Sequence, residues 1–230
     1  MKVSGSGSSS GPIQAAGTAR RAIRALIVVN TPAMRSVRRR WSTILKAEAA
    51  DYVLRFAASM LKEGTWAARL LSYECVANHP EAFAALNDAL IESLAAGLAD
   101  WGSIDLFGVT LTGPAWREGK LSTTRVRSWA RSPDRWRRRL ALVSTVRLNV
   151  HGRSSDSKRT LDICSRLLKD RDPMVVKALS WALRALAKCD QDSVQHFMAA
   201  NGETVPALVR REVHNKLVAG TKRGRRVWWK

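Results

Sequence analysis

The sequence is short of acidic residues. Its 230 residues include 19 Asp and Glu against 39 Lys and Arg, which gives a formal charge of +20. Positive charges in such excess repel one another on a small domain, so a partner that screens them is expected. Nucleic acid is the first candidate for this polyanion, and an anionic membrane surface is the second.

Cysteine and long apolar runs are also scarce. The three cysteines, Cys75, Cys164 and Cys189, lie far apart, form no CxxC motif and have no paired histidines at ligand spacing. This excludes a disulfide framework and a zinc site, and it favours a reducing compartment. The start of the chain lacks the apolar core of a signal peptide, and the apolar stretch 25–29 is far too short to span a bilayer. We therefore expect a cytoplasmic protein with no membrane partner, no metal and no cofactor.

Runs of alternating β-branched residues are almost absent, while signals for helix starts recur. Thr31-Pro32 and Asp172-Pro173 each place a capping side chain before a proline at the first helical position, and Asp134 is a further cap. Apolar residues recur at helical spacing behind these caps. The sequence therefore predicts an all-α protein, with helices over 17–29, 32–47, 48–62, 65–78, 81–96, 103–111, 122–131, 134–148, 158–169, 173–188, 190–200 and 205–218.

The domain organisation follows from composition and from a weak repeat. Residues 1–12 are a Gly/Ser-rich tail expected to be disordered, residues 13–219 are expected to form a single domain, and residues 220–230 form a basic tail. Asp134 and Asp172 are 38 residues apart, and so are Arg139 and Lys177. A period near 40 is typical of stacked HEAT-type helix pairs, and a globular bundle of short helices is the alternative.

Basic residues gather in three clusters. Residues 117–153 hold eleven basic residues against two acidic ones, a second cluster is Arg35 with Arg38, Arg39 and Arg40, and a third lies within 222–226. Acids roughly balance bases over 47–116. Each run alone is typical of a solvated helix face. Three runs together, in a chain with nine Trp, favour a phosphate-binding surface with aromatic anchors.

Trp101 and Asp105 are the first candidate site. If Ser103 caps a helix, Asp105 lies in the first turn and Trp101 just before it, so both face the same side of the helix start. The free amides there stabilise a carboxylate. On spacing alone, a structural aspartate beside a packed tryptophan is the more frequent arrangement.

Two pairs of tryptophan and arginine are the other candidates. Trp136 precedes Arg139 by three residues, Trp181 precedes Arg184 by three, and Lys177 precedes Trp181 by four, so each pair shares a helix face. An aromatic ring beside a guanidinium suits a sugar and its phosphate. For either pair alone, a core tryptophan with a surface arginine is the simpler explanation.

Taken together, these motifs occur in the order of a known family. The chain resembles the AlkD-type DNA alkylation repair glycosylases over roughly residues 30–217. The resemblance is carried by Thr31-Pro32 with Arg35, DWGSIDLFG (100–108) with Gly113-Pro114, WARSPDRWRRRLAL (129–142), DPMVVKALSWALRALAK (172–188) and the closing Val209-Arg210-Arg211-Glu212.

The resemblance implies a right-handed α-solenoid of HEAT-like antiparallel helix pairs with a basic concave face. It implies a monomeric, monofunctional enzyme that removes cationic N-alkylated purines, such as 3-methyladenine and 7-methylguanine, from duplex DNA without flipping them into a pocket. The matching catalytic positions are Asp105, Trp101 and Trp181, with Arg139 at the family's phosphate-contacting arginine. Further DNA contacts are expected from Arg138, Lys177, Arg135, Trp136, Arg184 and Arg35.

The residue types fit the chemistry that the resemblance implies. An alkylated purine already carries a positive charge, so it leaves without a general acid. The sugar then becomes an oxocarbenium ion, which the carboxylate of Asp105 would stabilise while it orients or deprotonates the attacking water. The indole faces of Trp101 and Trp181 would each add about 0.5–2 kcal/mol of cation-type attraction.

The chain departs from the family pattern in two places. Gly102 follows Trp101 where relatives often have Asp, and the N-terminal helices offer no clear aromatic near the lesion, because Tyr73 fits the core and Tyr52 is the only other tyrosine. The competing class is a non-catalytic nucleic-acid-binding protein on the same scaffold, in which Asp105 is buried in a helix cap. A protein-interaction scaffold is disfavoured, since nothing acidic balances the arginines.

Overall fold

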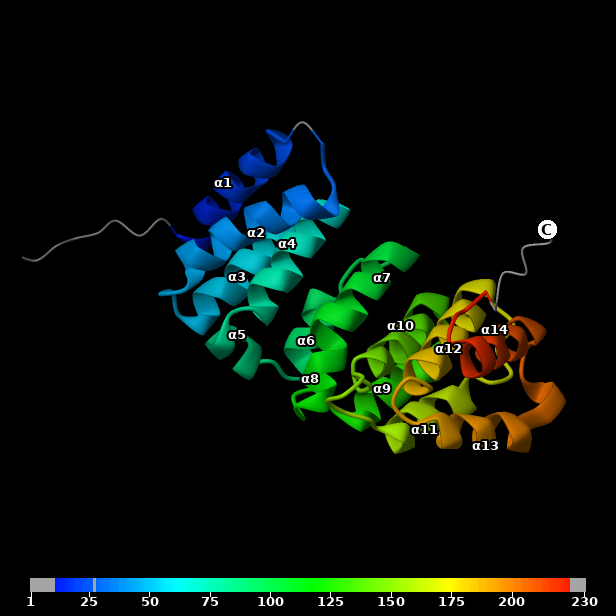
Figure 1. Ribbon diagram of the computed structural model, residues 1–230. Coiled ribbons are helices and arrows are strands. Elements are labelled where there is room, and N and C mark those ends of the chain that lie inside the picture. The colour runs from blue at the N-terminus through cyan, green and yellow to red at the C-terminus, as the bar shows by residue number, and fades with distance from the viewer. Residues whose placement is uncertain (1–10, 27, 224–230) are drawn as a thin grey trace, which may run out of the picture. The chain divides into compact units, whose positions relative to one another are not determined.

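The computed structural model describes residues 11–26 and 28–223, and this part of the chain is helical with no β-strand (Figure 1). The all-α prediction is confirmed. The chain divides into two compact units, residues 1–85 and 86–230, and each is described by itself. Within the described ranges, no helix is long and apolar enough to cross a membrane.

The first unit packs its helices around a small apolar core. Its helices are α1 (Pro12–Arg24), α2 (Thr31–Leu45), α3 (Ala50–Leu61), α4 (Trp66–Ala77) and α5 (Pro80–Ala84). Helix α3 packs against α1 and α4, and α2 packs against α4. Trp41 stacks on Phe56 with ring centroids 5.2 Å apart. Tyr73 is fully buried, which confirms its place in the core.

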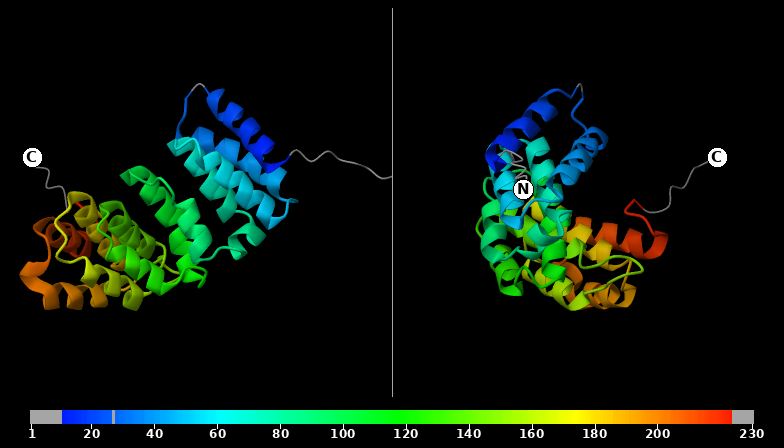
Figure 2. Two further views of the ribbon diagram at one scale, coloured as in Figure 1. Left: turned by 180° about the vertical axis from the view of Figure 1, so that it is seen from behind. Right: turned by 90° about the vertical axis from the view of Figure 1, so that its left-hand side faces the viewer.

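The second unit holds every candidate residue except Arg35. Its helices are α6 (Asp88–Leu94), α7 (Trp101–Phe107), the π-helix η1 (Gly108–Thr112), α8 (Gly113–Arg117), α9 (Thr123–Ala130), α10 (Arg135–Val146), α11 (Ser157–Arg166), α12 (Pro173–Leu186), α13 (Gln191–Asn201), the 3₁₀ turn η2 (Gly202–Thr204) and α14 (Ala207–Ala219). Helix α12 packs between α10 and α14, while α9 packs against α10 and α11 (Figures 1 and 2). Thus α10, α12 and α14 form one row of neighbouring helices.

Two glycines let the segment after α7 approach α10 closely. A Cβ atom on Gly108 would lie 2.4 Å from Cγ1 of Val143, and one on Gly113 would lie 2.7 Å from Cβ of Arg147. No side chain fits at such distances, because interiors are close-packed. This approach brings α7, which carries two of the candidate residues, against α10, which carries four.

The predicted caps are confirmed where an aspartate precedes the helix. The carboxylate of Asp134 accepts a hydrogen bond from the amide of Trp136 at 2.9 Å, and that of Asp172 accepts one from the amide of Met174 at 2.8 Å. The Thr31 cap is wrong, because Asn30 caps α2 and Thr31 is its first residue. The side-chain oxygen of Asn30 accepts a hydrogen bond from the amide of Ala33. Asparagine is among the residues most favoured at the N-cap position.

Several predicted boundaries are also wrong. The helix predicted over 81–96 is two helices, α5 and α6, because Asn87 caps a new start by accepting from the amide of Leu90. The prediction over 103–111 covers parts of α7 and η1, and η1 is followed directly by α8. The cap of α7 is Asp100, not Ser103, since the Asp100 carboxylate accepts from the amide of Ser103 at 2.8 Å. Asp105 is therefore the fifth residue of α7 and lies beyond its first turn.

The two predicted tails lie mostly outside the described residues. Residues 1–10 and 224–230 are not described, so the expected disorder of the N-terminal tail concerns a part of the chain that the structure leaves out. Pro12, which the composition places in that tail, is the first residue of α1. At the other end Gly220 closes α14 in a left-handed conformation, with φ 70°.

Candidate active site

A carboxylate and a guanidinium from neighbouring helices form the centre of the candidate site. Asp105 on α7 accepts two hydrogen bonds from Arg139 on α10, from Nε to Oδ1 at 2.9 Å and from Nη2 to Oδ2 at 2.8 Å. Nη1 of Arg139 donates to the carbonyl oxygen of Met174 on α12. One side chain thereby joins α7, α10 and α12, and the paired geometry fixes the plane of the carboxylate.

Asp105 is held in a partly desolvated place. Its side chain is 19% exposed, while that of Arg139 is 7% exposed. Burial raises the pKa of Asp105 above its ordinary value of 3.8, and Asp100 adds to this, whereas the hydrogen bond and charge of Arg139 act in the opposite direction. The arginine, rather than the helix amides expected from the sequence, is therefore what stabilises this carboxylate as an anion.

An exposed indole stands beside this carboxylate. Trp101 is the first residue of α7, one helical turn before Asp105, so the two residues share a face of the helix. Trp101 is 60% exposed, whereas tryptophan is highly buried on average. Such an aromatic surface is available to pack against a ligand that approaches Asp105.

Trp181 lies on α12, the neighbour of α10 in the row formed by α10, α12 and α14. It is half-buried and lines a pocket with Arg184, and no contact with Asp105 is among its interactions in the described residues. Arg184 donates from Nε to the hydroxyl of Ser180 at 3.1 Å and lies 3.6 Å from Oε2 of Glu212. Burial lowers the pKa of Arg184, and Glu212 opposes this shift.

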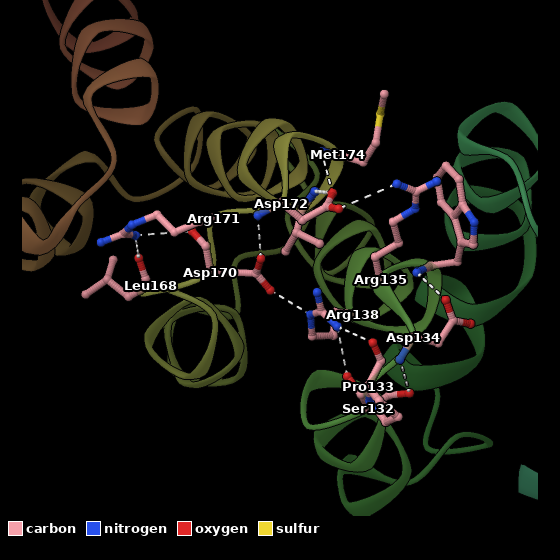
Figure 3. Close-up of polar contacts among 12 residues, drawn as sticks. Ser132, Pro133, Asp134, Arg135, Arg138, Leu168, Asp170, Arg171, Asp172 and Met174 are labelled. Atoms are coloured by element: carbon pink, nitrogen blue, oxygen red, sulfur yellow. Dashed lines mark hydrogen bonds and ion pairs between the residues drawn. The ribbon is translucent and has the colours of Figure 1, made fainter.

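Arg138 and Arg135 are bound by the acidic segment that precedes α12 (Figure 3). Nε of Arg138 donates to Asp170 at 2.6 Å, and its Nη1 donates to the carbonyl oxygens of Ser132 and Pro133. Arg135 remains 53% exposed, with Nη1 3.7 Å from the carboxylate of Asp172. The guanidinium of Arg138 is therefore occupied by contacts within the protein, whereas that of Arg135 is exposed to solvent.

The partner of Trp136 differs from the one that spacing suggested. The guanidinium of Arg135 lies over the indole of Trp136, 4.8 Å from its centroid, whereas Arg139 turns to Asp105. Lys177 is exposed and has no acidic partner among the described residues. Arg35 is exposed on α2 and belongs to the first unit, so it is described apart from this site.

Sequence reasoning missed the acidic partners of the arginines. Glu92 on α6 accepts from Nε1 of Trp129 at 2.6 Å and from Nη1 of Arg137 at 2.7 Å. Glu212 is buried on α14 and accepts from the hydroxyl of Ser180 at 2.6 Å. These partners are more than 30 residues apart in sequence, so no local pattern could reveal them. Asp170 lies two residues before the cap Asp172, and this position is the one signal of an acidic partner that the sequence offers.

The site offers acid–base and electrostatic chemistry. No group of three or more His, Cys, Asp or Glu side chains in the described ranges could hold a metal ion. The residues present are one oriented carboxylate, the cation that holds it and an exposed aromatic face. This combination can stabilise a developing positive charge and activate a water molecule.

One comparison with known proteins finds a relationship. A family model described as "DNA alkylation repair enzyme" matches residues 14–217, which is most of the chain and begins earlier than the motifs alone indicated. No curated protein and no solved structure matches the chain.

Proposed function

Because the chain belongs to the DNA alkylation repair enzyme family, and so has an enzymatic role in DNA repair, we propose that it is a monofunctional DNA glycosylase. Its substrates would be cationic N-alkylated purines, such as 3-methyladenine and 7-methylguanine, in duplex DNA. The observation that carries this proposal is the carboxylate of Asp105, oriented by two hydrogen bonds from Arg139 and placed one turn from the exposed indole of Trp101.

The proposed reaction is a hydrolysis at C1′ of the lesion. The bond between C1′ and the purine nitrogen breaks, and the bonding electrons neutralise the cationic base, which departs. A bond forms between C1′ and the oxygen of water, and Asp105 accepts the proton that the water loses before passing it to solvent. No group needs to protonate the base, so the reaction is confined to lesions that already carry charge.

Asp105 is suited to the oxocarbenium ion because it is fixed before the charge develops. A preorganised carboxylate needs no reorientation when C1′ becomes positive, and partial burial strengthens the attraction. Arg139 reduces the net negative charge at this place, but it holds the carboxylate of Asp105 in position. The faces of Trp101 and Trp181 would add attraction to the cationic sugar without requiring that the base leave the stack.

The wider proposal concerns how DNA is held. We assign the backbone contacts to Arg135, Trp136, Lys177 and Arg184, on a HEAT-like solenoid whose basic concave face receives the duplex; the row formed by α10, α12 and α14 supports this arrangement. Arg139 keeps two N–H groups beyond its three contacts with the protein, and these would meet a phosphate. The enzyme would act as a cytoplasmic monomer.

One observation favours the second candidate, a DNA-binding protein without catalysis. The pair of Asp105 and Arg139 joins α7 to α10, which is a structural task sufficient to explain both residues. Asp105 is, however, not the helix cap that this alternative requires, since Asp100 has that role. The two candidates differ in whether the carboxylate is needed for chemistry or only for packing.

Substitution Asp105→Asn tests the proposal. Release of 7-methylguanine from methylated duplex DNA should fall by about 10²–10³-fold, the typical effect of losing one charge-stabilising group, while duplex affinity stays within about twofold. Asp162→Asn is the matched control, because Asp162 also accepts from arginines, Arg127 and Arg166, within the second unit. Full activity in the Asp105 variant, or equal losses in both variants, would contradict a catalytic carboxylate.

A further inference from the structure

A further group of cations surrounds a pocket of about 530 Å³ formed by the C-terminal ends of α10, α12 and α14 and the segments that follow them. We name it the α12–α14 pocket. Among the described residues, its lining includes no acidic side chain and five cations: Arg147, Arg184, Lys188, Lys216 and Lys222. Trp181 supplies an aromatic wall.

Within the described ranges, acidic side chains balance only part of the charge around this pocket. Glu212 lies 3.6 Å from Arg184 and 3.2 Å from Nζ of Lys222, so one buried carboxylate is shared by two cations. Arg147 and Lys188 have no acidic partner among the described residues. Like charges gathered around one cavity repel one another, and an anionic ligand relieves that repulsion.

Hydrogen bonds hold the walls in place. Nδ1 of His151 donates to the carbonyl oxygen of Lys188 at 2.7 Å, which ties the segment after α10 to the end of α12. Asn215 donates to the carbonyl oxygen of Lys222 at 3.2 Å, and Nζ of Lys216 donates to that of Gly220 at 2.6 Å. These hydrogen bonds therefore hold in place the backbone that carries the cations.

Helix α12 carries a row of two cations and an aromatic ring on one face. Lys177, Trp181 and Arg184 follow one another at intervals of four and three residues, and Lys188 lies two residues after the helix ends. The seven residues from Lys177 to Arg184 rise by roughly 10 Å. A DNA strand carries one phosphate per about 3.4 Å of helix axis, so this row matches roughly three nucleotides.

We propose that the α12–α14 pocket binds a phosphodiester of the DNA, several nucleotides along the strand from the lesion. Arg147 and Lys188 would donate to the phosphate oxygens, while Trp181 keeps its proposed place at the sugar of the lesion. The inference rests on the proposed function in that its ligand is the DNA substrate. It assigns a binding role to Arg147 and Lys188, which are separate from the catalytic pair.

The first test compares two double variants in binding to an undamaged fluorescent duplex, followed by anisotropy over a salt series. Arg147→Ala with Lys188→Ala should weaken binding about eightfold near 0.1 M salt and reduce the salt slope by about one unit, the effect of one lost phosphate contact. Lys158→Ala with Lys169→Ala is the control, because both lysines are exposed, lie in the second unit outside the pocket and have no acidic partner among the described residues. Equal losses in the two variants would overturn the inference, since they would reflect overall charge alone.

The second test locates the phosphate. A duplex with one abasic-site analogue fixes the register, and single phosphates are replaced in turn by neutral methylphosphonates. One replacement should weaken binding to the unaltered protein about eightfold but leave binding to the pocket variant unchanged. A variant that responds like the unaltered protein at every position would show that no phosphate enters the pocket. Failure of the unaltered protein to bind any duplex would instead overturn the proposed function itself.

Discussion

Two arginines close to each other in sequence have opposite surroundings. Arg139, in the middle of α10, is nearly buried and makes three hydrogen bonds to neighbouring helices, whereas Arg147, directly after the end of α10, is exposed and has no acidic partner among the described residues. The first cation fastens α7 and α12 to α10. The second lines a pocket with other uncompensated cations. The place of an arginine in a basic stretch of the sequence therefore does not determine whether its side chain stabilises the fold or is available to bind a ligand.

The same distinction applies to the whole basic stretch from 117 to 153. Arg127, Arg137 and Arg138 each form an ion pair of 2.6–2.8 Å with a carboxylate on another part of the second unit. Partly exposed pairs of this kind add about 1 kcal/mol or less, but they do remove cations from the set available to DNA. The effective binding surface is smaller than the count of basic residues suggests.

The largest expected effect that separates the two arginines is on stability. Arg139→Ala leaves the partly buried carboxylate of Asp105 without its partner and should lower the free energy of unfolding by about 2 kcal/mol. Arg147→Ala removes an exposed cation and should change it by less than about 0.5 kcal/mol. Urea denaturation followed by circular dichroism measures both. Similar values for the two variants would mean that the ion pair does not fasten the helices.

The exposed indole of Trp101, one helical turn from Asp105, should matter for the rate of excision and not for folding. Trp101→Ala removes a π face worth about 0.5–2 kcal/mol, so excision of 7-methylguanine should slow by roughly two- to thirtyfold. The melting temperature should hardly move, because the side chain is mostly exposed. Trp101→Phe, which keeps an aromatic face, should recover most of the rate. A variant with lowered melting temperature and unchanged rate would place Trp101 in the fold instead of the site.

A smaller effect should appear in the pH dependence. Burial raises the pKa of Asp105 above 3.8 and Arg139 opposes this, so kcat/KM should fall on the acid side at a pH above that value. The folded protein then binds this proton more tightly than the unfolded chain, so the carboxyl contributes stability at low pH that is lost as the pH rises through its folded pKa. Arg139→Gln should move the acid limb to higher pH. Excision rates between about pH 4.5 and 8 measure this limb, and an unmoved limb would separate Arg139 from the titration of Asp105.

Local signals in the sequence were informative where one interaction dominated. Asp134 and Asp172 were correct caps because a carboxylate lies directly before a long helix. The predicted Ser103 cap is wrong because Asp100 caps the amide of Ser103, so α7 already begins at Trp101 and Ser103 lies inside it. The helix predicted over 81–96 is too long for a similar reason, because Asn87 caps the start of a separate helix, α6.

The sequence by itself determined the all-α class, through apolar spacing and caps that act within four residues, and its ordered motifs determined the family. It also placed Asp105 and Trp101 on one helix face, because that relation too is local. The pairing of Asp105 with Arg139, and the gathering of Arg147 and Lys188 around a pocket, were decided by tertiary structure. Their physical reason is packing: residues 34 or 41 positions apart meet only where helices lie against one another, and burial then determines which cations are neutralised.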